Sequence, residues 1–313
     1  MRKLSSRRRT SAWLTAASVA MAYARPAAAH HEALFGPQSS LAVESEGFVS
    51  LQAHEHVFGN GSTYDQETAY ILSAGVSPFQ AVPWSLTLVQ AYTYENTRTP
   101  QGDQTGPLSS CGGCIARENL LISTSYRLDF KGLQRATGKD GNFALLSAAI
   151  EPPTGEKDYA AFHGPVNYIF AGMAGFEWGP FASVALGYYR LNAADDSGAK
   201  KGNNWLAGLG FAYTPVDERA RMISLQLGLA AEVHDADVVG GASTVSGGWE
   251  LFASPTVVWM PAGRTRFFTY VSLPVAQDYK ADYQVDHWRA GLGVIYSFER
   301  VSRGEVGRAL ERE

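Results

Sequence analysis

The chain has 313 residues with 26 basic and 30 acidic side chains, and 45% of its residues are hydrophobic. Its mean hydropathy is −0.14, and it contains no run of about 18 apolar residues, which excludes a transmembrane helix. The 32 glycines, 15 tyrosines and 15 phenylalanines, against 5 methionines, favour short strands and turns over helices.

Residues 1–29 predict a signal peptide. The basic start "MRKLSSRRR" precedes the moderately apolar "TSAWLTAASVAMAYA", and "RPAAA" offers a small-residue site that predicts cleavage after Ala29. This segment holds six of the basic residues and no acidic ones, so the rest of the chain carries a net charge of −10. An acidic exported protein is a poor partner for nucleic acid, so no nucleic-acid partner is expected.

From residue 47 onward, apolar and polar residues alternate in twelve segments, as in strands with two unlike faces. In "MISLQLGLAAEV", for example, Ile223, Leu225 and Leu227 share one face, and Ser224 and Gln226 the other. Each segment is close to the roughly 9–11 residues with which a tilted strand crosses a bilayer. Two of them, 142–151 and 166–176, alternate weakly, and their facing is left open. The segments are 47–58, 67–77, 84–95, 117–130, 142–151, 166–176, 179–192, 203–214, 221–233, 248–260, 264–275 and 286–298.

The connections between these segments alternate in length. "SPFQAVP", "EWGP" and "PAGR" are short, whereas "NTRTPQGDQTGPLSSCGGC", "PPTGEKDYAAFHGP" and "HDADVVGGASTVSGG" are long and polar. One connection, "KGLQRATGKDG", is longer than this pattern expects. Short turns at one end and long loops at the other are typical of outer-membrane barrels. An even number of strands also lets an antiparallel meander close without an unpaired edge.

Aromatic side chains on the apolar faces gather at both ends, if the first strand runs from the periplasm to the exterior. The periplasmic ends carry Trp84, Tyr213, Trp259, Tyr296 and Phe298, and the exterior ends carry Tyr94, Trp205, Trp249 and Trp288. A barrel in lipid has two such girdles. The sequence therefore predicts an all-β fold, a transmembrane antiparallel up-and-down β-barrel of about 12 strands over 47–298, in the outer membrane of a Gram-negative bacterium. A soluble β-sandwich fits so many outward apolar residues less well.

The last segment, "HWRAGLGVIYSF", places Leu292, Val294, Tyr296 and Phe298 on one face and ends on an aromatic residue. It resembles the last strand of bacterial outer-membrane β-barrels, which the barrel-assembly machinery reads as a targeting signal. In most such proteins the aromatic residue ends the chain, whereas here the charged tail 299–313 follows it. This tail is expected to be periplasmic. The architecture resembles transporter-type barrels of the phenol-degradation (meta-pathway) group and, more distantly, FadL. This resemblance implies outer-membrane lipid as surroundings and a passage for small solutes.

Histidines form the main candidate site. His54 and His56 point inward from the first strand, and His287 and Arg289 from the last. Because the first and last strands of a closed barrel are neighbours, the three imidazoles are expected near the exterior mouth, where they suit Cu, Zn, Ni or Co. The alternative is that they only hydrogen-bond within a polar lumen. The loop residues Glu232, His234, Asp235 and Asp237 lie at the same end.

Two further candidates lie outside the strands. Cleavage after Ala29 makes His30 and His31 an amino-terminal nitrogen ligand set for Cu(II), while 30–46 is otherwise a plain leader or a plug in the lumen. Cys111 and Cys114, separated by two glycines, predict a small disulfide loop at an oxidising location, with metal binding by the thiolates as the alternative.

The function expected from these features is a channel or transporter for small solutes, with a link to transition metals such as Cu or Zn through the inward histidines. The sequence contains neither G-x-S-x-G nor H-E-x-x-H, so an enzyme is the less favoured alternative. It would place His163, or His234 with Asp235, at the barrel mouth. The third possible function is that of a closed structural or adhesive barrel. Tyr189, Phe268 and Tyr270 are also expected to point inward, which leaves the openness of the lumen undecided.

Overall fold

The structure, a computed structural model, describes the wall of the molecule and parts of its connections. The described residues are 47–60, 63–77, 83–97, 115–129, 143–155, 166–178, 180–194, 198–214, 223–239, 241–243, 247–262, 264–279 and 285–298. The expected signal peptide 1–29, the segment 30–46 and the tail 299–313 lie outside these residues, so they stay predictions.

Every regular element among the described residues is a strand. The strands are β1 (Gly47–Asn60), β2 (Thr63–Val76), β3 (Trp84–Thr97), β4 (Ile115–Arg117), β5 (Leu121–Asp129), β6 (Phe143–Glu151), β7 (Asn167–Trp178), β8 (Phe181–Leu191), β9 (Asn204–Tyr213), β10 (Ile223–His234), β11 (Val238–Val239), β12 (Ala242–Ser243), β13 (Gly248–Ala262), β14 (Thr265–Tyr279) and β15 (Val285–Phe298). Within the same residues, no helix is both long and apolar enough to cross a membrane.

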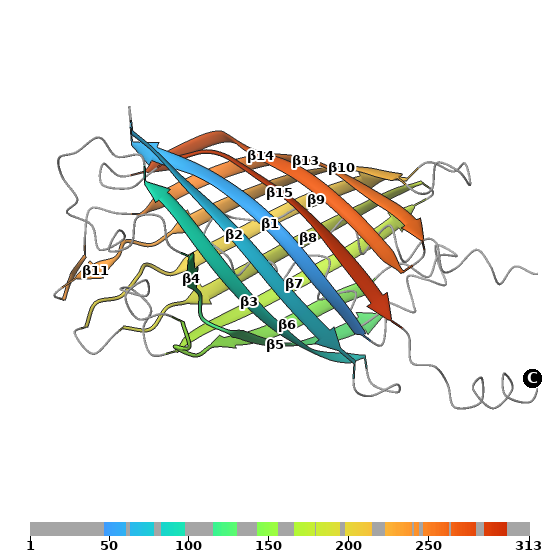
Figure 1. Ribbon diagram of the computed structural model, residues 1–313, viewed down its shortest axis with the longest axis horizontal. Coiled ribbons are helices and arrows are strands. Elements are labelled where there is room, and N and C mark those ends of the chain that lie inside the picture. Colours follow the sequence, from blue (N-terminus) through green and yellow to red (C-terminus); the bar gives the residue numbers. More distant parts are fainter. Residues whose placement is uncertain are drawn as a thin grey trace, which may run out of the picture.

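The main sheet closes on itself as a barrel. Each strand pairs antiparallel with its neighbours along the chain, and β1 pairs with both β2 and β15, from Gly47 opposite Phe298 to Gly59 opposite Val285. Figure 1 shows the tilted strands with β1, in blue, beside β15, in red. The sheet has 13 strands, but β4 and β5 share one position beside β3, which leaves twelve positions around the ring. The predicted barrel is therefore confirmed.

One predicted strand, 117–130, is divided in two. β4 pairs with Tyr92–Tyr94 of β3, and β5 pairs with Trp84–Val89, so the chain leaves the ladder between them. The Gln90 side chain covers the gap by donating from Nε2 to the backbone oxygen of Glu118 at 2.8 Å. The wall is thus irregular at this point, near the end of the barrel that carries the long connections.

The outer face of the wall is apolar. In β10, exposed residues alternate with buried ones from Ile223 to His234, and the exposed set consists of Ile, Leu, Ala and Val. Comparable exposed apolar side chains occur on other strands, with Leu146 at 55%, Leu209 at 51% and Leu292 at 61%. Such a surface is unfavourable in water and matches the hydrocarbon core of a bilayer.

Aromatic residues mark both edges of this apolar band. At the end with the short turns, Trp259 stacks on Phe267 with ring centroids 5.2 Å apart, and Phe181 contacts Tyr213 at 5.3 Å. At the opposite end, Trp205, Trp249 and Trp288 are exposed on the outer face. We call these the turn end and the loop end. In outer-membrane barrels the loop end faces the exterior.

The inner face is more apolar than the sequence suggests. Ile71, Val89, Leu121, Ile169 and Leu206 belong to one buried cluster that extends from β2 to β10. Because lipid meets the outside and this cluster meets the inside, β6 and β7 are apolar on both faces, which explains their weak alternation. The predicted inward Phe268 and Tyr270 are buried. The prediction for Tyr189 was wrong, because Tyr188 takes the inward position and Tyr189 packs against the outward Trp205 at 4.0 Å.

Candidate functional site

Six inward side chains form a charged network at the loop end, which we call the Arg289 cluster: His56, Glu232, His234, Glu250, Asp286 and Arg289. They come from β1, β10, β13 and β15. Neither β11 nor β12 contributes, so β10 and β13 are direct neighbours in the wall. The network therefore joins the neighbouring strands β10 and β13 to β15 and β1, and it passes β14, which lies between β13 and β15.

A break in the register decides which residue of β15 faces the lumen. Val57 is opposite Trp288, but Phe58 is opposite Asp286, so one residue of β15 is passed over between these pairs. Asp286 thereby takes the inward position that strict alternation would give to His287, and its Oδ1 lies 2.7 Å from Nε2 of His56. His287, which the sequence predicts beside His54 and His56, is the residue at this irregularity.

Arg289 is the only cation of the cluster that is charged at every working pH, because the guanidinium does not lose its proton. Its Nη2 atom donates to Oε1 of Glu250 at 2.6 Å and also to Asp286. Its Nη1 atom lies 3.7 Å from Oε2 of Glu232, and its Cζ atom lies 3.7 Å from the centre of the Phe252 ring. One guanidinium thus serves three carboxylates on three strands.

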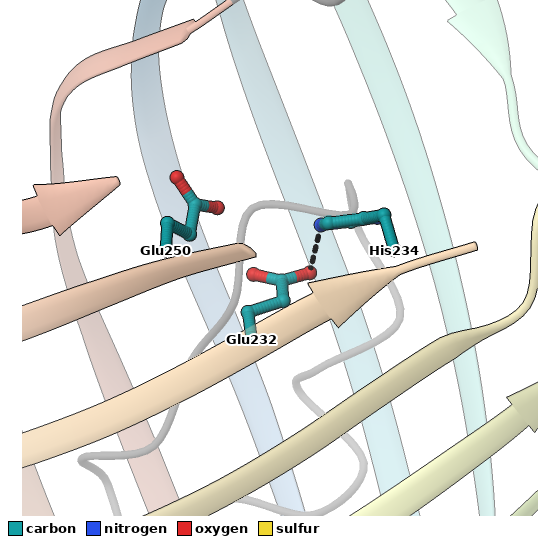
Figure 2. Close-up of side chains that lie close together, drawn as sticks. All are labelled: Glu232, His234 and Glu250. Carbon is teal, nitrogen blue, oxygen red and sulfur yellow. Dashed lines mark ion pairs between the residues drawn. The ribbon is translucent and has the colours of Figure 1, made fainter. Parts of the chain in front are cut away.

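Glu232 and His234 stand two residues apart on β10, so both side chains point into the barrel. Nε2 of His234 lies 2.8 Å from Oε1 of Glu232. Glu250 is directly opposite Glu232 on β13. Figure 2 shows the His234 ring directed at the Glu232 carboxylate, with the Glu250 carboxylate beside them from the neighbouring strand. One ligand atom from each of the three residues can be chosen so that all lie within 4.8 Å of one another.

A second ion pair lies on β6 and β8. Nη2 of Arg190 donates to Oε2 of Glu151 at 2.7 Å, and the Asn167 amide donates to the same oxygen at 3.3 Å. Both charged side chains are almost fully buried, at 5% and 0% exposure. Lys201, in the connection before β9, lies near this pair. Burial is the main cause that lowers the pKa of the Lys201 ammonium, and the charge of Arg190 adds to it.

His54 lies deeper in the lumen and makes different contacts. Its Nε2 atom lies 3.1 Å from Oε1 of Gln52, and its Nδ1 atom lies 2.7 Å from the hydroxyl of Tyr270. Since an amide oxygen only accepts, Nε2 carries the proton and Nδ1 accepts from Tyr270. Both nitrogens of His54 are therefore engaged within the wall.

The structure regroups the predicted site residues. Among the described residues, His54, His56 and His287 do not form a group with ligand atoms within 4.8 Å, whereas Glu232, His234 and Glu250 do. The sequence pattern places Glu232 and His234 at the right end but misses Glu250 and Asp286. The alternating pattern of β13 assigns Glu250 to the inner face, so the sequence does contain a signal for this residue.

Several predicted residues cannot be placed. His30, His31, Cys111 and Cys114 lie outside the described residues, so metal binding at the amino terminus and the disulfide stay predictions. The same holds for His163, on which the enzyme alternative partly rests. The other histidine of the enzyme alternative, His234, pairs with Glu232, while the adjoining Asp235 is exposed.

No family model matches the sequence, and no curated protein matches it. Among solved structures, the chain is similar to the COG4313 outer membrane channel from Pseudomonas putida F1, with a TM-score of 0.62 and 12% identity over 81% of this chain and 96% of that one. The beta domain of the Bordetella autotransporter BrkA has a TM-score of 0.48 at 12% identity, covering 81% and 100%. The NanC porin has a TM-score of 0.47 at 10% identity, covering 80% and 99%.

The likeness to the COG4313 channel shows a shared fold. Together with the apolar outer wall and its aromatic edges, this fold makes the chain a β-barrel of the outer membrane, surrounded by lipid. The resemblance to outer-membrane channel barrels is thus confirmed at the level of the fold, while the more distant one to FadL stays a prediction.

Proposed function

We propose that this outer-membrane barrel is a channel or transporter for small solutes. The observation that carries the proposal is the Arg289 cluster, a network of charged side chains on the inside of a closed wall. Buried charges are costly in a barrel that serves only as a structural support. Placed around a passage, the same charges select solutes by their sign.

The inward charges are unevenly distributed between the two ends. At the loop end the described residues include six buried carboxylates, Glu67, Glu118, Glu151, Glu232, Glu250 and Asp286, but only two buried arginines, Arg190 and Arg289. At the turn end, Arg127 and Arg266 are the buried charges of the described strands. An excess of carboxylates at the mouth raises the local concentration of cations. The proposed channel therefore prefers small cations over anions at its loop end.

The test is the reversal potential of the refolded protein in a planar bilayer under a potassium chloride gradient. We expect conductance steps and a potential of the sign that cation preference gives. Glu250→Gln should reduce this potential. Glu55→Gln is the matched control, because Glu55 lies on the outer face and accepts a hydrogen bond from Thr68 at 2.8 Å. A folded protein without steps, or an equal effect of both substitutions, would contradict the proposal.

The finer part of the proposal links the channel to transition-metal ions through inward histidines. His54, His56 and His234 stand on the inner face, and imidazole is a good ligand for Cu and Zn. We expect Zn(II) added on the loop side to lower the single-channel current reversibly, with recovery on adding a chelator. A block that survives replacement of all three histidines by alanine would assign the effect to other ligands, such as His30 and His31.

A further inference from the structure

We propose that Glu232, His234 and Glu250 bind one divalent transition-metal ion. The proposal deepens the metal link of the proposed channel by naming its ligands, but it does not require the lumen to be open. It also moves the site away from His54, His56 and His287, the group that the sequence predicts.

The first argument is the arrangement of the backbone. Glu232 and His234 occupy successive inward positions of β10, and Glu250 is paired directly with Glu232 on β13. His234 is opposite Gly248, which has no side chain to compete for the space beside the imidazole. Three ligands are therefore held by two paired strands rather than by a loop, and all three residues are buried.

The second argument is charge. Glu232, Glu250 and Asp286 carry three formal negative charges, and Arg289 carries one positive charge, so the cluster holds a net charge of −2 with neutral imidazoles. Like charges this close, away from water, repel strongly. One divalent ion cancels this excess. Two arrangements without a metal also reduce this excess: protonated histidines paired with Asp286 and Glu232, or a protonated Glu250 carboxyl. Measurement must distinguish them from a bound ion.

The third argument is a carboxylate oxygen that is available to bind an ion. Glu250 is 1% exposed, and its Oε1 atom accepts from Arg289. Tyr279 also interacts with this carboxylate, but no hydrogen bond of 3.5 Å or less reaches Oε2 from the described residues. A buried carboxylate oxygen without a partner costs free energy that a bound ion would recover. Because Arg289 holds the other oxygen, it would act as a positioning residue that fixes the carboxylate while Oε2 binds the ion.

The donor set indicates which ions fit. One imidazole nitrogen and two carboxylate oxygens suit Zn(II), Co(II), Fe(II) or Mn(II), whereas Ca²⁺ and Mg²⁺ prefer oxygen alone. Around a tetrahedral ion with bonds of about 2.0–2.1 Å, ligand atoms lie about 3.3 Å apart. Nε2 of His234 and Oε1 of Glu232 are now 2.8 Å apart. Opening this contact by about half an ångström, a side-chain movement, would admit the ion.

The test is titration of the refolded, untagged protein in detergent with Co(II), followed by the visible absorption of the bound ion, and with Zn(II) by calorimetry. We expect one saturable site whose Co(II) spectrum contains nitrogen and oxygen ligands. His234→Ala and Glu250→Gln should each weaken binding beyond the roughly 10- to 100-fold lost when an outer partner of a ligand is changed. Heat-dependent mobility in gel electrophoresis checks that each variant is folded.

Two controls keep the result specific. His54→Ala removes an inward imidazole that is bound to Gln52 and Tyr270, and it should leave the affinity unchanged. The double variant His30→Ala/His31→Ala removes the other candidate ligands and should leave this site intact. Absence of saturable binding to the folded protein, or binding that survives His234→Ala and Glu250→Gln, would overturn the metal site and leave the cluster as an ion-pair network. The metal titration does not depend on conductance, so its failure would leave the channel proposal to be tested by the bilayer experiment.

Discussion

Removal of one partner of the buried ion pair of Arg190 and Glu151 should strongly lower the stability of the barrel. At an effective dielectric constant of about 20, charges 2.7 Å apart attract each other by about 6 kcal/mol. Arg190→Met deletes this attraction but leaves Glu151, at 0% exposure, without its cation. Protonation of the carboxyl and the amide of Asn167 recover part of the loss. We therefore expect a cost of about 3–5 kcal/mol in the free energy of unfolding.

The assay is urea unfolding of the protein from lipid vesicles, followed by tryptophan fluorescence. With a slope of about 2 kcal/mol per molar urea, this cost lowers the midpoint by about 2 M. The double variant Arg190→Met/Glu151→Gln should regain most of the stability, because it leaves no unpaired buried charge. Arg117→Met is the matched control, since the exposed Arg117 donates to the backbone oxygen of Thr154, and it should cost no more than about 1 kcal/mol.

The reasoning would be refuted by a cost of Arg190→Met below about 1 kcal/mol, or by a double variant that is as unstable as the two single effects added together. Either result would mean that water reaches the pair and screens it.

The remaining predictions concern the wall, and the same unfolding assay tests them. Leu227 lies midway between the levels of Trp259 and Trp249 on the outer face, so Leu227→Arg should cost about 2–4 kcal/mol, whereas Val233→Arg, opposite Trp249, should cost about 0–1. Equal costs would mean that the apolar band does not face lipid. A Cβ atom on Gly291 would lie 2.3 Å from Cε1 of Tyr270, which is fixed by its bond to His54, so Gly291→Ala should cost about 1–3 kcal/mol. Gly172→Ala, whose nearest atom is Cδ2 of Leu146 at 3.8 Å, should be neutral, and a cost similar to that of Gly291→Ala would argue against a steric cause.

Much of the wall follows from the sequence because lipid leaves little choice. A strand that crosses a bilayer needs apolar residues at every second position, and this requirement alone identifies β10 and β15 and their outward faces. Strands with two apolar faces do not show this alternation. In β6 and β7, lipid on one side and the buried cluster that contains Ile169 on the other leave apolar residues on both faces. In β8, two adjoining tyrosines offer the same size to both faces, so Tyr189 was assigned to the wrong one.

The candidate site was less predictable, because it depends on register across strands. Alternation places His287 inward only if β15 is regular up to its start. The shift beside Val57 and Phe58 brings in Asp286 instead. Glu250 could have been assigned to the inner face, but its meeting with Glu232 requires the pairing of β10 with β13 across a long connection. Single-strand patterns carry no information about such pairings.

Because β1 pairs with β15, the order of the strands in the sequence can be changed without changing which strands are neighbours in the barrel. Gly47 is the partner of Phe298 at one rim, so the two ends of the wall lie side by side. A circularly permuted chain, with a short linker from Phe298 to Gly47 and new termini in the long connection between β3 and β4, would keep every ladder of the ring unchanged. In that chain, however, β15 would stand in the middle of the sequence. Comparing its assembly with that of the natural order would show whether the aromatic-ended strand must be the last of the wall, or needs only to be present.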